Sequence, residues 1–255
     1  MPDEHAFFAA HGWVVIRNVV PRGRLEELER AVNEVFAASP PPRPGEVWEL
    51  SAVSRGSPEI ARHTHDAAIA RLAAAALGCA RIQLLQDTVL VKPALVGGEV
   101  AWHQDHTYTG YLAPPRMASV RLALTECTIE NGCLEVIDGS HEWGQVGDVR
   151  ALSEPSVADA LGDRAAAWID RVVPLELEPG DLSIHHCFTF HRSGANRSAR
   201  TRKTLITRLF DADCRLVEKL LPPGVAAHFP VDAEGRLSQV AFPILWPGSD
   251  VTVAP

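Results

Sequence analysis

The chain has few cysteines, no long hydrophobic run and little positive charge. Its five cysteines are scattered and include no Cys-x-x-Cys pair, so neither a disulfide framework nor a structural zinc site is predicted. No stretch of about 18 uninterrupted apolar residues occurs, and the first residues lack a basic segment followed by an apolar one. We therefore expect no membrane span, no signal peptide and a cytoplasmic location.

The shortage of positive charge limits the possible partners. Lysine and arginine together number 24, against 32 aspartate and glutamate residues, and the formal net charge is −8. Proteins that bind nucleic acids normally present a basic face, so we expect no nucleic-acid partner. A small-molecule ligand is compatible with this composition, because a local basic pocket can lie inside an acidic protein. The sequence does not indicate an oligomeric state.

Hydrophobic residues make up 46% of the chain, enough for a sizeable core, and their pattern changes at Gly78. Before Gly78, apolar residues at helical spacing predict helices over residues 3–11, 25–32 and 57–77. A short run of β-forming residues, 13–16, lies between the first two helices. The first third of the chain is therefore expected to be mostly helical.

After Gly78, short runs of β-forming residues alternate with turn signals such as Gly97-Gly98 and Asn131-Gly132. The predicted strands lie at residues 82–91, 119–124, 133–137, 172–175, 181–184 and 204–207. This pattern predicts a mainly β fold with flanking helices, in which a cupin-like jelly roll (a double-stranded β-helix) forms the core. We expect one domain over residues 1–255, with a helical part at 1–78, the core at 79–212 and a C-terminal extension at 213–255. A helical or irregular insertion at residues 142–170 interrupts the strands.

The motif Trp102-His103-Gln104-Asp105 is the most informative stretch of the chain. On a β-strand, His103 and Asp105 would point to the same face, and His191 follows in a late strand. Two histidines and one carboxylate form the facial triad of non-heme Fe(II) oxygenases, which leaves metal positions open. A jelly roll can bring these segments together at its mouth. The alternative is that His103 and Asp105 form a surface pair and His191 is a core residue with satisfied hydrogen bonds.

A basic run follows His191. Arg202 directly precedes the apolar run that starts at Thr204. An arginine at the start of a buried strand is well suited to bind a carboxylate through two hydrogen bonds. Arg197 and Arg200 fit a solvated loop better.

Three motifs in this order carry a resemblance to a known family. They are Trp102-His103-Gln104-Asp105, Asn131-Gly132-Cys133-Leu134-Glu135-Val136-Ile137-Asp138-Gly139-Ser140-His141, and Pro179-Gly180-Asp181 followed by His191-Arg192-Ser193-Gly194-Ala195-Asn196-Arg197-Ser198. The chain resembles the phytanoyl-CoA dioxygenase family of Fe(II)/2-oxoglutarate oxygenases over about residues 80–210, and the N-terminal helices also fit.

The resemblance implies a role for each matching residue. His103, Asp105 and His191 would be the catalytic ligands of Fe(II). Arg202 would bind the distal carboxylate of 2-oxoglutarate, with assistance from Ser193. Further contacts with this cosubstrate are implied for Lys92 and Thr88.

Substrate contacts are predicted more loosely. Gln86 matches a substrate-contacting glutamine of the ectoine hydroxylases in this family, and Trp102, Tyr108, Arg121 and Phe190 are further candidates for the pocket lining. Arg121 departs from the family, in which many members carry an aromatic residue there. It is expected either to contact an acidic substrate or to form a structural ion pair, for example with Glu135.

Three other histidines are secondary candidates. His141 lies in a Gly-Ser-His turn that is structural in the family. His186 is expected near the mouth, outside the set of ligands. We do not assign a metal role to His185 or His186.

The implied activity is that of a dioxygenase that uses Fe(II), 2-oxoglutarate and dioxygen (O2) and releases succinate and carbon dioxide. The carboxylate of Asp105 favours hydroxylation, or desaturation or epoxidation, because related halogenases carry a small residue there. The substrate is expected to be a small metabolite, including those of specialised biosynthesis. Segments 40–56, 106–116 and 142–170 are candidates for a lid.

Two alternatives stay open. A cupin-like metalloenzyme would keep the triad without needing 2-oxoglutarate, Arg202 or Lys92. A non-catalytic binding module would keep the fold alone.

Overall fold

The computed structural model describes residues 2–146, 158, 161–162, 165–221 and 224–247. The principal helices are α1 (Pro2–His11), α2 (Arg22–Ala37), α3 (Pro58–Thr64), α4 (Ala67–Leu77), α5 (His106–Thr109) and α7 (Ala165–Trp168). The strands are β1 (Trp13–Ile16), β2 (Trp48–Ser51), β3 (Ile82–Lys92), β4 (Val100–His103), β5 (Leu112–Ala113), β6 (Met117–Ala123), β7 (Leu134–Ile137), β8 (Val172–Leu175), β9 (Leu182–His186), β10 (His191–Ser193), β11 (Arg202–Asp211), β12 (Arg215–Leu216) and β13 (Ile244–Trp246).

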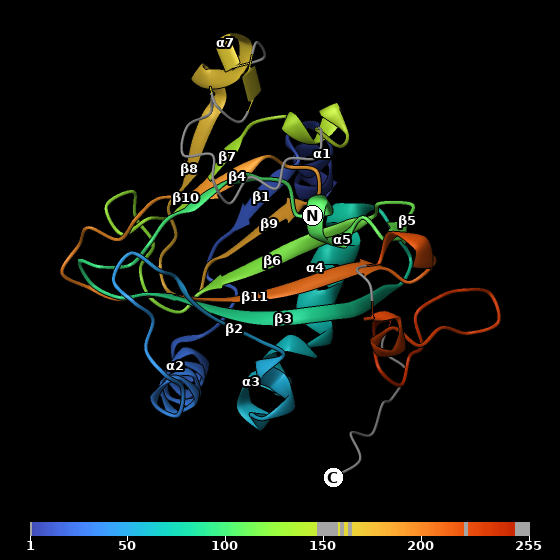
Figure 1. The fold of residues 1–255 in the computed structure, drawn as a ribbon, viewed down its shortest axis with the longest axis horizontal. Coiled ribbons are helices and arrows are strands. Elements are labelled where there is room, and N and C mark those ends of the chain that lie inside the picture. Colours follow the sequence, from blue (N-terminus) through green and yellow to red (C-terminus); the bar gives the residue numbers. More distant parts are fainter. Residues whose placement is uncertain (1, 147–157, 159–160, 163–164, 222–223, 248–255) are drawn as a thin grey trace.

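Two antiparallel sheets form the core (Figure 1). The larger sheet has the order β1-β9-β6-β11-β3-β13, and β2 also pairs with β3. The smaller sheet has the order β4-β10-β7-β8. Most neighbours in both sheets are not consecutive strands of the chain, which is characteristic of a jelly roll rather than a simple meander. The predicted mainly β fold with a jelly-roll core is therefore confirmed.

The helices cover the outer face of the larger sheet. Helix α4 packs against β3, β6, β9, β11 and β13, and Figure 1 shows it running across these strands. Its alanine-rich face permits this close approach, since Ala70 and Ala73 are completely buried. Helices α2 and α3 contact each other and extend the same hydrophobic core.

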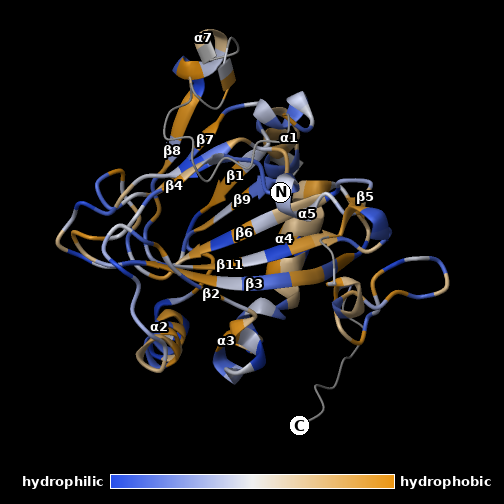
Figure 2. Ribbon diagram, in the orientation of Figure 1, coloured by the Kyte–Doolittle hydropathy of each residue, from blue (hydrophilic) through white to orange (hydrophobic). Residues whose placement is uncertain are grey.

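Alternation along the central strands separates this core from the inner face. On β6, Val120 and Leu122 join the helix-covered core, so Ser119 and Arg121 must face the opposite way. Strand β11 behaves likewise, because Leu205 and Leu209 belong to the same core. Figure 2 shows the result as hydrophobic and hydrophilic bands along the strands. The inner face of the larger sheet therefore carries polar side chains between the two sheets.

Two local predictions were wrong. The helix expected over residues 57–77 is two helices, because Asp66 caps α4 by accepting a hydrogen bond from the backbone N–H of Ala68 (2.8 Å). Strand β2 was not predicted, and it forms by pairing with β3. Much of the insertion predicted at residues 142–170 lies outside the described residues. None of the described helices is both long enough and apolar enough to cross a lipid bilayer.

Candidate active site

The smaller sheet brings two histidines face to face. His103 ends β4 and His191 begins β10, and the two residues are direct partners in the antiparallel pairing of these strands. Their ring centroids lie 4.2 Å apart. The Oδ1 atom of Asp105 lies 3.9 Å from Nε2 of each histidine. All three residues are buried, and one ligand atom from each lies within 4.8 Å of the others.

Asp105 reaches this position by a route that the sequence did not predict. Strand β4 ends at His103, and Asp105 adopts helical backbone angles (φ −59°, ψ −31°) at the position before α5. The expectation that strand alternation places His103 and Asp105 on one face was therefore wrong. A turn, not a strand, directs the carboxylate toward the two imidazoles.

Backbone carbonyls fix the orientation of both imidazoles. His103 Nδ1 lies 2.8 Å from the carbonyl oxygen of Ala101, and His191 Nδ1 lies 2.8 Å from that of Thr189. Because a carbonyl only accepts, each Nδ1 carries the proton and each Nε2 presents a lone pair. Burial lowers the pKa of both side chains. Both rings are thus held neutral, in the tautomer that can bind a metal ion.

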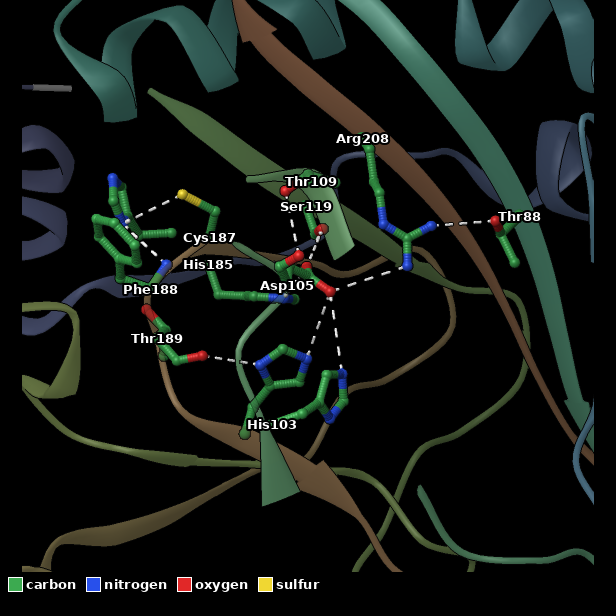
Figure 3. Close-up of polar contacts among 12 residues, drawn as sticks. Thr88, His103, Asp105, Thr109, Ser119, His185, Cys187, Phe188, Thr189 and Arg208 are labelled. Carbon is green, nitrogen blue, oxygen red and sulfur yellow. Dashed lines mark hydrogen bonds and ion pairs between the residues drawn. The ribbon is translucent and has the colours of Figure 1, made fainter. Parts of the chain in front are cut away.

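The carboxylate of Asp105 is also held in one orientation (Figure 3). Its Oδ2 atom accepts a hydrogen bond from Ser119 Oγ (2.6 Å) and lies 3.2 Å from His185 Nε2. Its Oδ1 atom lies 3.9 Å from Nη2 of Arg208. Burial alone would raise the pKa of Asp105, but Arg208 and the hydrogen bond from His185 outweigh it, so the pKa lies well below its usual value. The carboxylate is ionised, and Oδ1 is left to bind a metal.

Sequence reasoning assigned no role to Ser119 or Arg208, and it treated His185 only as a secondary candidate. These residues lie on three different strands that meet in the larger sheet. Their positions depend on strand register, so no local motif identifies them. The other secondary candidates have structural contacts: His141 Nε2 lies 3.0 Å from the carbonyl oxygen of Ala9, and His186 Nδ1 accepts a hydrogen bond from the backbone of Phe188 (3.2 Å).

A cavity opens beside the triad. Its walls come from both sheets and consist of Glu49, Leu90, Val100, His103, Asp105, Ser119, Arg121, Leu134, His185, His191, Arg192, Ser193, Ile206 and Arg208. These walls carry both aliphatic and charged side chains. Such a cavity can hold a small polar ligand against a metal ion.

Arg202 contacts Ser193, a residue of the cavity wall, and has unused hydrogen-bond donors. The side chain is completely buried. Its Nη1 donates to the carbonyl oxygen of Gly132 and lies 3.4 Å from Ser193 Oγ. Within the described part of the chain, its Nε and Nη2 have no partner. A buried guanidinium with free N–H groups on one edge is arranged to bind a carboxylate.

The other residues predicted to contact the cosubstrate make contacts within the protein. Lys92 Nζ donates to the carbonyl oxygens of Ser193 (2.9 Å) and Gly194. Burial, together with the nearby Arg202, lowers the pKa of Lys92 to about 6. Thr88 Oγ1 accepts a hydrogen bond from Arg208 Nη1 (3.1 Å), so Thr88 positions Arg208.

Two predicted pocket residues lie elsewhere. The rings of Trp102 and Phe190 stack at 5.6 Å in a separate hydrophobic cluster with Ile137. The prediction that Trp102 and Phe190 line the pocket is therefore corrected. The physical reason is strand alternation: each directly precedes a metal-facing histidine and so points to the opposite side.

The remaining candidates surround the site at different depths. Tyr108 is half exposed and its ring approaches that of His103 edge-on, with centroids 6.0 Å apart. Gln86 lies on β3 opposite Arg208. Arg121 lines the cavity. The expected partner of Arg121, Glu135, instead pairs with Arg192 through distances of 2.8 and 3.1 Å.

Comparison with known proteins agrees with this geometry. The family model described as Phytanoyl-CoA dioxygenase (PhyH) matches residues 8–204, which is most of the chain. The chain belongs to the phytanoyl-CoA dioxygenase family. The resemblance predicted from the three motifs is thereby confirmed.

Proteins similar in sequence carry names of different dioxygenases. Phytanoyl-CoA dioxygenase 1 of Oryza sativa subsp. japonica is 33% identical over 138 residues, which cover 52% of this chain and 46% of that protein. The ectoine dioxygenase of Sphingopyxis alaskensis is 27% identical over 213 residues, which cover 75% of this chain and 69% of that protein. The chain spans about half the length of the rice and mouse relatives.

Solved structures share the fold. The non-heme alpha-ketoglutarate-dependent epimerase SnoN from nogalamycin biosynthesis aligns with a TM-score of 0.79 at 22% identity, covering 95% of this chain and 97% of that one. EctD from S. alaskensis, solved with 2-oxoglutarate and 5-hydroxyectoine, aligns with a TM-score of 0.73 at 22% identity, covering 92% and 86%. At this identity the likeness shows the fold alone.

Proposed function

We propose that this member of the phytanoyl-CoA dioxygenase family is a dioxygenase that uses Fe(II), 2-oxoglutarate and dioxygen (O2) to hydroxylate a small-molecule metabolite, releasing succinate and carbon dioxide. The observation that carries the proposal is the convergence of three metal-ready donors, Nε2 of His103, Nε2 of His191 and Oδ1 of Asp105. The family supports it, and so do the names of the similar proteins, which include an ectoine dioxygenase.

The residues fit both groups that this chemistry needs. His103, Asp105 and His191 would hold Fe(II), since two neutral imidazoles and one carboxylate are a donor set that Fe(II) accepts with positions left open. Arg202 would hold the distal carboxylate of 2-oxoglutarate with its unpartnered Nε and Nη2. When bound, iron and 2-oxoglutarate together supply the activation of dioxygen that oxidises the substrate.

The protein contributes orientation and exclusion of water. Ser119 and His185 hold Oδ2 of Asp105, so the carboxylate offers a single oxygen. The aliphatic side chains Leu90 and Ile206 line the cavity beside the triad, and they limit how much water reaches it. The chain retains a carboxylate at position 105, which favours hydroxylation over halogenation.

Arg202 also separates the proposal from the main alternative. A cupin-like metalloenzyme that does not use 2-oxoglutarate has no need for a buried guanidinium with free N–H groups. Leaving such groups without a partner is unfavourable. Their presence in a side chain that contacts Ser193 of the cavity wall therefore favours an acidic cosubstrate.

Anaerobic visible spectroscopy tests the proposal directly. Adding Fe(II) and 2-oxoglutarate to the wild-type protein should produce a charge-transfer band, which requires both groups at one centre. The His103→Ala and Asp105→Ala variants should lose the band and any substrate-dependent formation of succinate. Arg202→Met should keep metal binding and raise the 2-oxoglutarate concentration at half-saturation. A wild-type protein that binds iron but gives no band would favour the cupin-like alternative.

Arg116→Met provides a matched control for Arg202→Met. Arg116 is half exposed and pairs with Asp211 at 2.9 Å, outside the cavity. This variant also loses an arginine, but it should leave both the band and the half-saturation concentration unchanged.

A further inference from the structure

Arg121 is a buried guanidinium that has no partner in the described protein. Its side chain is 7% exposed, it lines the cavity, and its Nη2 atom is inaccessible to solvent without a hydrogen bond. No carboxylate in the described part of the chain forms an ion pair with it. An unpaired charge in this environment is strongly unfavourable. The arrangement therefore indicates that an anion from outside the chain belongs beside Arg121.

The pairing of β6 with β11 places Arg121 beside the part of β11 that lies between Arg202 and Arg208. Arg121 of β6 lies directly opposite Ile206 of β11. Because alternate residues of β11 share a face, Arg202, Ile206 and Arg208 all point inward with it. Burial and the nearby Arg202 lower the pKa of Arg121 to about 10, so it remains positively charged at neutral pH.

The acidic residues around the cavity are committed elsewhere. Glu135 pairs with Arg192, and both oxygens of Asp105 already face Ser119, His185 or the histidine ligands. Glu49 is an exposed side chain on β2. None of these neutralises Arg121.

The hydrogen-bond donors next to Arg202 already bind backbone carbonyl oxygens. Ser193 donates its single hydroxyl proton to the carbonyl oxygen of Gly132 (2.9 Å), and Lys92 already donates to two backbone carbonyls. The two oxygens of a carboxylate can accept about four hydrogen bonds. The free Nε and Nη2 of Arg202 fill only part of this capacity, so a second donor can bind the same end of the ligand.

We propose that Arg121 is this second donor, and that the distal carboxylate of 2-oxoglutarate lies between the guanidinium groups of Arg121 and Arg202. This inference rests on the proposed function. It makes the site selective for diacids, because a 2-oxo acid without the second carboxylate would leave buried N–H groups of both guanidinium groups without a partner. Losing Arg121 should weaken 2-oxoglutarate binding roughly 10- to 100-fold, the range for a charge-assisted interaction with a buried carboxylate.

A thermodynamic cycle between Arg121 and the ligand tests the contact. Calorimetry on the Mn(II)-loaded full chain would compare 2-oxoglutarate with 2-oxopentanoate, which has a methyl group in place of the distal carboxylate. Arg121→Met should lower the affinity for 2-oxoglutarate and leave the affinity for 2-oxopentanoate unchanged. Arg121→Lys should retain part of the affinity for 2-oxoglutarate that Arg121→Met loses. Arg116→Met should change neither affinity. Equal effects on both ligands, or no effect on 2-oxoglutarate, would overturn the proposal and leave Arg121 for the primary substrate.

Thermal unfolding of the ligand-free protein gives an independent reading. Arg121→Met removes an unpaired buried charge, so its melting temperature should equal or exceed that of the wild type. Failure to fold, or a large drop in melting temperature, would show a structural partner for Arg121 and contradict the proposal. Failure of the proposed function looks different: the wild-type protein would then bind no 2-oxoglutarate at all.

Discussion

Removing the hydroxyl of Ser119 should weaken metal binding without disturbing the fold. Ser119 Oγ donates to Oδ2 of Asp105 at 2.6 Å, and both side chains are buried. A hydrogen bond to a charged group contributes about 1.5–3 kcal/mol. His185 remains as a second donor at 3.2 Å, so we expect the lower end of this range for Ser119→Ala. That corresponds to an affinity for Mn(II) about 10-fold weaker, consistent with the effect of losing an outer contact to a metal ligand.

Ser183 offers a matched control on the neighbouring strand. It is completely buried on β9, and its Oγ has no hydrogen-bond partner among the described residues. Ser183→Ala removes the same atom from the same sheet, so it should leave the affinity for Mn(II) unchanged.

The affinity of both variants for Mn(II) can be measured by titrating the metal-free protein. Calorimetry or the electron paramagnetic resonance signal of free Mn(II) would report the binding. Their unfolding temperatures should be measured in parallel without metal, so that a loss of folded protein is not mistaken for weak binding. Equal affinities in Ser119→Ala and Ser183→Ala would refute the view that Ser119 orients the carboxylate.

Two further predictions concern the 2-oxoglutarate end of the site and the helical layer. A Cβ on Gly132, whose φ is +77°, would lie 2.0 Å from the carbonyl oxygen of Gly194, so Gly132→Ala should displace the carbonyl that holds Arg202 and weaken 2-oxoglutarate binding. Gly235→Ala has the same φ and no atom within 4 Å, so calorimetry should detect no change there. Burial lowers the pKa of His63 from 6.5 to about 4. Below pH 6.5, His63 is therefore protonated in the unfolded chain while it stays neutral in the folded chain. The free energy of unfolding should fall by about 3 kcal/mol between pH 6.5 and 4. Urea denaturation of His63→Leu should show a smaller loss on acidification than the wild type, and an equal loss would contradict this assignment.

The sequence predicted long elements better than short ones. Strands β3, β6 and β11 are the three longest in the described part of the chain, and their hydrophobic pattern was sufficient to identify them. Strand β2 has four residues, none of them fully buried, so its existence depends on pairing with β3 rather than on its own preference. The break between α3 and α4 falls in the polar stretch 62–66, which a prediction of one helix over residues 57–77 passed over. Asp66, a strong capping residue, was the available signal.

The site was predictable to the extent that local motifs describe it. The motifs at His103 and His191 named residues that the fold does bring together, although the turn at Asp105 was mistaken for a strand. Trp102 was predicted to line the pocket because strand alternation was applied to His103 and not to Trp102. The same rule places Trp102 on the opposite side of the strand from His103. Ser119 and Arg208 belong to the site only through the register of the larger sheet, which no single segment encodes.

The direct pairing of His103 with His191 makes the centre sensitive to strand register. A slip of one residue between β4 and β10 would turn one imidazole to the outside of the barrel, where no small adjustment of side chains returns it. Occupancy by metal and integrity of the β4–β10 ladder are thus linked. On heating we expect the bound ion to be released in one step as these strands separate, with no gradual weakening beforehand.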